Sequence, residues 1–103
     1  MRIIKPSRVR EYAARHPVAG ESLARWLKVA AHGQWKRFAD TRATFGAGVD
    51  PVTVASGRTV TVFDIQGNRF RLVTAIHYNT GMLFVLDFLS HAEYDKERWK
   101  RTL

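Results

Sequence analysis

The spacing of apolar residues changes near the middle of the chain, and this change limits the folds that the chain can adopt. In the first third, apolar side chains recur three and four residues apart, as on one face of a helix. They predict an amphipathic helix over residues 7–16, with Ser7 as its N-cap, and a second helix that Pro17 opens and that ends near Gly33. We expect the two helices to form a hairpin that covers a sheet.

Beyond Gly48, β-branched and aromatic residues follow in short runs that Gly and Asn interrupt. The runs predict up to four strands, over residues 52–55, 58–65, 69–78 and 82–90. The segments 66–68 and 79–81 suit tight hairpins, because Gly and Asn tolerate positive φ angles. The strands are therefore expected to form an antiparallel meander.

Two further segments flank the strands. Residues 34–48 are expected to form a structured connection that can include one helical turn over residues 39–44. After the last strand, residues 92–101 predict a short basic helix, with Ser90 as its cap and Glu93 completing a capping box. Together the patterns predict an α+β protein with an N-terminal helical hairpin, a small antiparallel sheet and a short C-terminal helix.

Length and composition point to one folded unit. A chain of 103 residues is too short for two cores, so we expect a single domain over residues 1–103. Its hydrophobic fraction of 46% suits a globular protein. The chain has no Cys, which excludes disulfides and a cysteine nucleophile, and we find neither a signal peptide nor a membrane span. A soluble cytoplasmic protein is the expectation.

The charge balance is strongly basic. Seventeen Lys and Arg against nine Asp and Glu give a formal charge of +8. Polyanions such as nucleic acids are the natural partners of such a chain, and their binding would depend strongly on salt. An acidic partner protein could use the same charge, and a basic balance can also serve solubility alone. The charge therefore favours nucleic acid without deciding the matter.

The strand over residues 69–78 would place two arginines on one face of the sheet. A three-residue loop at 79–81 would pair Tyr78 with Met82 and put Arg71 opposite Leu89. The alternate residues of the 69–78 strand, beginning with Phe70, would then face the core. The other face would carry Arg69, Arg71, Asp87 and His91.

This face offers the groups that cleave RNA through its own 2′-hydroxyl. That reaction needs a base, an acid and cations for the crowded charge at phosphorus. His91 can be the base or the acid, Arg71 and Arg69 can hold the phosphate, and Tyr94, one helical turn on, can donate to the phosphate or share the proton relay. The mechanism needs no metal and no cofactor.

The same residues also have structural interpretations. Arg69 and Arg71 can belong to the solvated side of a half-covered sheet, and His91 with Asp95 can simply cap or pair at a helix start. The other histidines have no partners at ligand spacing, and the tryptophans suit a core better than a base-stacking surface. These residues are His16, His32 and His77, and Trp26, Trp35 and Trp99. Spacing alone leaves a nuclease and a nucleic-acid-binding module equally supported.

Several segments of the second half of the chain occur in a specific order, namely VFDIQGNRFRLV at 62–73, IHY at 76–78 and SHAEYDK at 90–96, with GQWK at 33–36 and Ala39, Asp40 and Phe45 upstream. In order and spacing these segments resemble the HigB-type mRNA interferase toxins of the RelE-like superfamily. With the upstream segments included, the resemblance covers nearly the whole chain.

The resemblance implies a RelE-like α/β fold and an endoribonuclease that cuts mRNA, typically on the translating ribosome. It also implies an antitoxin, usually a helix-turn-helix DNA-binding protein, through which the pair binds operator DNA. The family's motif positions fall on Arg71, His91 and Tyr94, with Asp95 and Lys96 beside them. Further basic residues are expected to bind or steer RNA, namely Arg69, Lys36, Arg37, Arg42, Lys96 and Lys100.

One position departs from the family pattern. Members usually carry Lys or Arg five residues before the motif histidine, where this chain has Leu86 followed by Asp87. A cation that helps to bind the scissile phosphate is missing there, so cleavage can be weaker or can rest on Lys96, Arg98 or Lys100. The alternatives to the enzyme are a basic module that binds RNA or the antitoxin without cutting, and a purely structural interaction protein.

Overall fold

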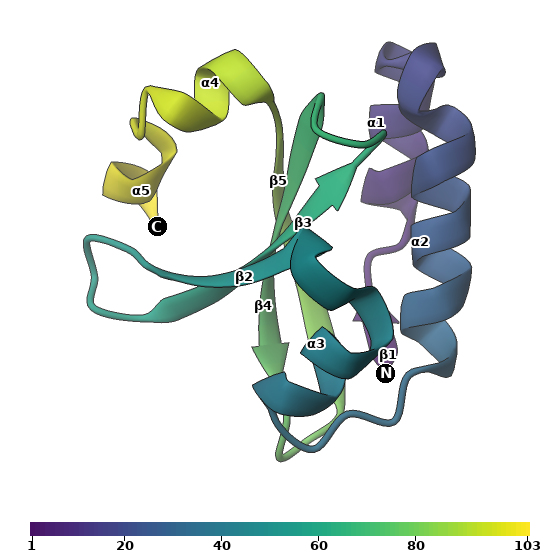
Figure 1. Cartoon of the computed structure of the whole chain (residues 1–103), viewed down its shortest axis with the longest axis vertical. Coiled ribbons are helices and arrows are strands. Elements are labelled where there is room, and N and C mark those ends of the chain that lie inside the picture. The colour runs from purple at the N-terminus through teal and green to yellow at the C-terminus, as the bar shows by residue number, and fades with distance from the viewer.

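The computed structural model describes residues 1–103 as a five-stranded sheet with helices on both sides (Figure 1). The strands are β1 (Arg2–Ile4), β2 (Val49–Thr53), β3 (Thr59–Ile65), β4 (Phe70–His77) and β5 (Met82–Ser90). Their order across the sheet is β1-β5-β4-β3-β2. Strands β2 to β5 form the expected antiparallel meander, and β1 pairs parallel to β5 at one edge. The predicted α+β class is confirmed.

The helices divide between the two faces of the sheet. They are α1 (Ser7–Arg15), α2 (Gly20–His32), α3 (Phe38–Phe45), α4 (His91–Asp95) and α5 (Trp99–Thr102), with 3-10 turns at Pro17–Ala19 and Gly46–Gly48. Figure 1 shows the α1–α2 hairpin on one side of the sheet and α4 with α5 on the other. None of these helices is long and apolar enough to cross a membrane.

Helices α1 and α2 begin differently from what the sequence predicted. Ser7 is not an N-cap, because Pro6 occupies the cap position and no side chain caps the helix. Pro17 opens a 3-10 turn rather than α2, which begins at Gly20. The turn has a physical reason: the chain must reverse direction there while it buries Ala19 completely. The predicted end of α2 at Gly33 is confirmed.

The sequence patterns did not predict β1, and they misplaced the start of β2 and underestimated the helix before it. Strand β1 has only three residues and is held by pairing with Met82–Phe84, which are distant in sequence. Strand β2 lies three residues before the predicted start, and Pro51 falls inside it. A proline is tolerated there because β2 is an edge strand with an unpaired side. The connection before it contains α3, a full eight-residue helix rather than a single turn.

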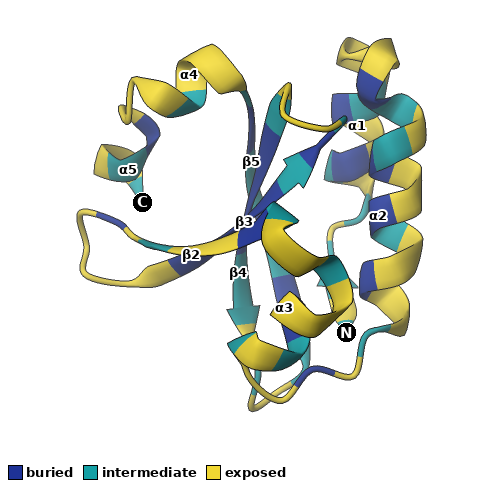
Figure 2. Cartoon of the chain, viewed as in Figure 1, coloured by how far each residue is buried: buried dark blue, intermediate teal, exposed yellow.

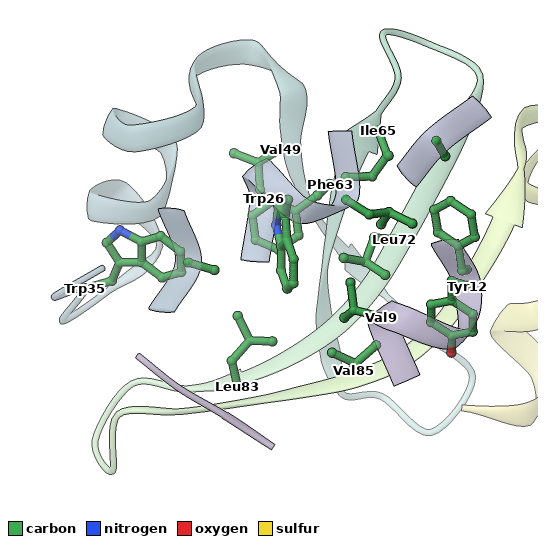
Figure 3. Close-up of a cluster of buried hydrophobic side chains, with 14 residues drawn as sticks. Val9, Tyr12, Trp26, Trp35, Val49, Phe63, Ile65, Leu72, Leu83 and Val85 are labelled. Atoms are coloured by element: carbon green, nitrogen blue, oxygen red, sulfur yellow. The ribbon is translucent and has the colours of Figure 1, made fainter. Parts of the chain in front are cut away.

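The larger core lies between the sheet and the helices α1, α2 and α3 (Figure 3). Its centre is Phe63, which is 1% exposed and meets the rings of Trp26 and Phe45 edge to face, with ring centroids 5.3 and 4.8 Å apart. Trp35 closes the core beside α3. The prediction that Trp26 and Trp35 are core residues is confirmed.

The second face of the sheet is also covered, although less completely. Helices α4 and α5 pack on it over a smaller cluster that includes Val73, Leu89 and Trp99. Val73 is fully buried, so this face is not a solvated one, and Trp99 is confirmed as a core residue. Figure 2 shows α4 exposed along most of its length, which suits a thin cover.

The C-terminal segment is two short helices and not the continuous helix over 92–101 that the sequence predicted. The chain breaks after α4, and Glu97 takes a positive φ of 59°. The break lets α5 turn back toward the β2–β3 hairpin, where the Lys100 carbonyl accepts a hydrogen bond of 3.0 Å from the Ala55 amide. The physical reason is the burial of Trp99, which a straight helix could not direct onto the sheet.

A β-bulge changes the pairing between β4 and β5. Val73 pairs with Asp87 and Thr74 with Val85, which leaves Leu86 as an extra residue on β5. The predicted pairing of Arg71 with Leu89 is therefore right. The predicted pairing of Tyr78 with Met82 is wrong by one residue, because His77 pairs with Met82 instead.

The outer side of β5 at the bulge is covered by α1. Strand β1 pairs only as far as Phe84. Beyond that point the Arg8 guanidinium donates to the carbonyl oxygens of Val85 and Leu86, at 3.0 and 3.3 Å. These bonds satisfy edge carbonyl groups that would otherwise be free to pair with another strand.

Candidate active site

The candidate site is the corner where β5 ends, α4 begins and β4 starts. The His91 amide donates to the Arg69 carbonyl oxygen at 2.8 Å, which extends the pairing of the two strands by one bond. The predicted capping box is present: Ser90 Oγ accepts from the Glu93 amide at 3.2 Å, and the Glu93 carboxylate accepts from the Ser90 amide. The box fixes His91 as the first residue of α4 and Tyr94 one turn later.

Arg71 is the most buried charged residue of the site, with 9% of its surface exposed. Its Nε lies 3.1 Å from Asp64 Oδ1, and its Nη1 donates to the carbonyl oxygens of Asn68 and Phe70. Its Nη2 donates to Asn68 Oδ1 and lies 3.3 Å from His91 Nδ1. An arginine has five N–H donors, so every donor of Arg71 has a partner within the protein.

This arrangement differs from the free guanidinium that the sequence analysis expected. Buried charges need partners, and four hydrogen bonds and one carboxylate satisfy this guanidinium. A phosphate could reach Arg71 only by replacing one of these partners. Asn68 lies in the exposed β3–β4 turn, so its side chain is the partner that a ligand from solvent can most easily replace.

His91 lies between a cation and a carboxylate. Because an arginine has no acceptor, His91 Nδ1 must accept the bond from Arg71, and the proton of the neutral ring is then on Nε2. Nε2 lies 3.3 Å from Asp95 Oδ2. The side chains of His91 and Asp95 are 47% and 60% exposed, so a ligand from solvent can reach this edge of the ring.

Tyr94 forms the floor beneath the guanidinium. Arg71 Cζ lies 5.4 Å from the centre of the phenol ring, which is a cation–π contact. The ring stacks on Trp99 with centroids 5.1 Å apart, and Trp99 Nε1 donates to the Tyr94 carbonyl oxygen at 3.1 Å. Burial raises the pKa of Tyr94, although Lys100 and Arg71 oppose the shift. The phenol is therefore neutral at physiological pH, and its hydroxyl is able to donate a hydrogen bond.

Sequence reasoning missed the two residues that hold Arg71 from the β3 side. Asp64 pairs directly with Arg71 across the β3–β4 ladder, and Asn68 lies in the turn between these strands. Burial raises the pKa of Asp64, and the neighbouring Arg71 charge opposes the rise. The pairing of β3 with β4 could have revealed Asp64, because an acidic residue opposite an arginine indicates a cross-strand ion pair. Asn68 had been assigned to the turn alone.

The other predicted basic residues divide into two groups. Three lie near the corner: the Arg69 carbonyl oxygen accepts from the His91 amide, Lys96 caps the end of α4, and the charge of Lys100 acts on Tyr94. Arg69 and Lys96 are exposed, while Lys100 pairs with Glu97 at 2.9 Å and lies over the Trp99 ring.

The second group lies on and before α3. Arg42 pairs with Asp50 at 3.4 Å, and both side chains are about half exposed. Lys36 and Arg37 are exposed in the connection that precedes α3. Lys36 lines a pocket with the Tyr78–Gly81 turn, at the end of β4 opposite to Arg71, so the fold does not bring Lys36 to the corner.

The remaining histidines pack or lie on the surface, as expected. His16 packs against Phe70 and Phe88, and His77 lies against Phe84. His32 Nδ1 bonds the Lys28 carbonyl oxygen of its own helix. The structure contains no group of three or more His, Asp or Glu side chains that could hold a metal ion.

The arrangement of a helical hairpin on a mostly antiparallel sheet, with a polar corner beside a short C-terminal helix, is that of a RelE-like protein. A family model described as HigB_toxin, the RelE-like toxic component of a toxin-antitoxin system, matches residues 19–97. The chain therefore belongs to the HigB toxin family. No curated protein matches the chain.

Proposed function

We propose that this toxin is an endoribonuclease that cuts mRNA on translating ribosomes, with its active site at the Arg71, His91 and Tyr94 corner. The single observation that carries the proposal is the contact of 3.3 Å between Arg71 and His91, which joins a fixed cation to an exposed imidazole. The formal charge of +8 supports a polyanionic substrate.

In the proposed reaction the 2′-oxygen of the RNA attacks the adjacent phosphorus and the bond to the 5′-oxygen breaks. The products are a 2′,3′-cyclic phosphate and a 5′-hydroxyl, so one proton leaves the 2′-hydroxyl and one reaches the leaving oxygen. His91 acts as general base or general acid in these transfers, because an imidazole exchanges protons near neutral pH. Tyr94, as a neutral phenol, donates to a phosphate oxygen or takes part in the relay.

Arg71 is proposed to act as the phosphate clamp by exchanging one partner. The phosphate would replace the Asn68 side chain at Nη2, while the bonds that the guanidinium donates to Asp64 and to the Phe70 carbonyl oxygen keep it in place. The phosphate would then lie beside His91. Charge-assisted bonds to a developing phosphorane are stronger than those to a neutral amide, which favours the exchange in the transition state.

The surrounding basic residues are proposed to bind or steer RNA. Arg69, Lys96 and Lys100 would act close to the corner, while Lys36, Arg37 and Arg42 would contact more distant RNA or ribosomal RNA. Such contacts release counterions, so binding is expected to weaken steeply as salt rises.

A toxin of this family has an antitoxin partner. We propose that the antitoxin is a helix-turn-helix protein and that operator DNA is bound only through it. The proposed substrate would locate the activity in the cytoplasm, and the reaction as written uses no metal or other cofactor.

The proposal is tested by expressing His91→Ala and Arg71→Ala beside the parent chain, without antitoxin, and mapping growth arrest and mRNA cut sites. Both substitutions are expected to abolish cleavage. Removing a general acid–base group typically costs about 10²–10⁴-fold in rate. Removing Arg71 also leaves Asp64 without its cation.

The matched control is His32→Ala, which removes an exposed histidine bonded only to its own helix and should leave toxicity unchanged. Circular dichroism of Arg71→Ala and of the milder Arg71→Lys separates lost folding from lost chemistry. Equal toxicity of the parent and the His91→Ala chain would remove the catalytic assignment.

A second candidate function is a module that binds RNA or the antitoxin without cutting. Two observations favour it: every donor of Arg71 is occupied, and Leu86, where relatives usually have a cation, packs in an apolar cluster. Salt-dependent RNA binding with no cleavage products on translating ribosomes would favour this function. If the chain showed no affinity for RNA, a purely structural interaction protein would be favoured.

A further inference from the structure

The second face of the sheet carries an open pocket beyond the area that α4 and α5 cover. The pocket measures about 380 Å³ and is lined by the ends of β3, β4 and β5. Burial falls along β4, from the buried residues 71–74 to the half-buried Ala75 and Ile76 and the exposed His77. Figure 2 shows this fall toward the end of the strand. Small-molecule sites typically begin at about 300 Å³, so the pocket is large enough for one flat ring system.

The lining of the pocket is mainly apolar, with one cation. Phe84 and His77 form an aromatic wall with ring centroids 5.0 Å apart, and Leu86 and Ala75 line the pocket beside them. Phe84 is half-buried and His77 is exposed, so both rings have surface available for a ligand. Arg58, which is exposed, lies at the same pocket.

The bulge at Leu86 puts this pocket and the candidate active site on the same face. Phe84 and Leu89 are five residues apart on one strand, so regular alternation would direct them to opposite faces. The extra residue restores a common face, because Leu89 pairs with Arg71 and Phe84 pairs with Ala75. Arg71 and Ala75 are four residues apart on β4, or about 13 Å along an extended strand.

We infer that this pocket binds a base of the RNA strand whose phosphate lies at His91. The inference rests on the proposed function and adds a second contact to it. Single-stranded RNA presents anionic phosphates and flat bases alternately. The corner supplies cationic and proton-transferring groups for a phosphate, and the pocket supplies aromatic and apolar surface for a base with Arg58 available for the backbone.

Leu86 takes a specific part in this subsite. It belongs to the apolar cluster of the second face and also lines the pocket, so it extends the covered part of the sheet to the bound base. A lysine at this position would bring a charge into the pocket and favour a phosphate there over a base. The chain thus uses base stacking where a basic side chain would use a phosphate contact.

The test uses the full chain carrying His91→Ala, so that cleavage does not disturb binding. Two fluorescein-labelled probes are compared by anisotropy: an RNA hexanucleotide of alternating adenosine and uridine, and the same ribose-phosphate backbone without bases. Phe84→Leu keeps an apolar side chain but removes the stacking surface. It should weaken binding of the intact probe about tenfold, as loss of one base–aromatic stack does, and leave the abasic probe unaffected.

Matched variants complete the design. Val18→Ala removes an exposed apolar side chain elsewhere and should change neither affinity. Leu86→Lys should strengthen binding of the abasic probe and reduce the preference for the probe with bases. The slope of log K against log salt concentration should become steeper by about 0.7 for each added phosphate contact. His77→Ala, at an exposed site, repeats the Phe84 test if that variant unfolds on heating before the parent does.

The outcomes separate this inference from the proposed function. Equal loss on both probes, or no loss on either, for Phe84→Leu and His77→Ala would overturn the base subsite even if the unsubstituted chain cuts mRNA. A selective loss on the intact probe, together with no cleavage by the unsubstituted chain on translating ribosomes, would keep the subsite and reject the enzyme. A pocket that only a protein partner covers would give no preference for bases and would likewise reject the inference.

Discussion

The two faces of the sheet are built differently. On one face, helices α1, α2 and α3 cover a cluster of fourteen buried side chains with interlocking aromatic rings. On the other, the five-residue α4 and the four-residue α5 cover a cluster of six. The buried arginine and its carboxylate lie at the edge of this second cluster. We infer that the first face supplies most of the stability and that the second provides the site.

The difference follows from the cost of burying charge. An arginine in the first cluster would face apolar rings and have no partners for its five donors. At the second face the end of β3 brings a carboxylate within reach of the arginine, the β3–β4 turn and the start of β4 bring backbone carbonyls, and the start of α4 brings an imidazole. A thin and partly open cover therefore allows a charged group that a closed core could not hold.

The strongest test of this comparison removes the centre of the first face. Phe63→Ala leaves a cavity between Trp26 and Phe45, and such changes typically cost about 3–5 kcal/mol. A small domain has only about 5–15 kcal/mol to lose. Urea unfolding followed by circular dichroism measures the loss. A loss below about 1 kcal/mol would show that the first face does not carry most of the stability.

Trp99→Ala makes the corresponding change on the second face. We expect a smaller loss of about 2–3 kcal/mol, because α5 is short and terminal and can relax around the gap. Tyr94 would also lose its stacking partner. The proposed RNA cleavage, measured per folded molecule, should therefore fall as well. The comparison would fail if this variant lost more stability than Phe63→Ala while cleavage remained at the parent level.

A third prediction concerns the N-terminal cap of α4, which holds the first turn of the second-face cover. Ser90→Ala removes the capping box that orients His91, and the loss of a cap typically costs about 1 kcal/mol. Amide hydrogen exchange should increase in α4 and not in α2. Ser7→Ala is the matched control, since Ser7 caps nothing, and its effect should stay within about 0.5 kcal/mol. Equal effects of the two substitutions would contradict the assigned role of Ser90.

The smallest expected effect is electrostatic. The pKa of Asp64 is raised, so the folded chain keeps this proton at a pH where the unfolded chain has lost it. The contribution of Asp64 to stability is thus complete below the ordinary carboxyl pKa and is lost as pH rises through the raised pKa. Asp50→Asn removes a charge that favours the rise, so it should lower the pKa of Asp64, as read by carboxyl-carbon NMR titration. A titration midpoint below the ordinary value would contradict the burial of this group.

Local patterns were enough to predict much of the fold. The spacing of Leu23, Trp26 and Ala30 predicted the buried stripe of α2, and the capping box at Ser90 was found as expected. The alternation in β4 placed Arg71 opposite Leu89 and near His91. These features depend on residues that are close in sequence or on one hairpin, so the pattern of side chains reports them directly.

Other features depend on segments that meet only in the folded chain. Strand β1 has only three residues, too few to show the two-residue alternation of a strand, and it forms because it pairs with β5. The bulge at Leu86 shifts one half of the β4–β5 ladder, which no count of loop residues could foresee. The turn after α4 is set by the burial of Trp99 against the sheet.

The sequence alone determined the class of fold and the family resemblance, and it selected Arg71 and His91 as candidate site residues, because periodicity and motif spacing are local properties of the chain. Only the tertiary structure decided that Arg71 is buried with all its donors occupied and that the pocket at Phe84 shares its face. The physical reason is that desolvation and hydrogen-bond partners are set by distant segments: Asp64, Asn68 and His91 reach one guanidinium only after two hairpins and a helix cap have formed.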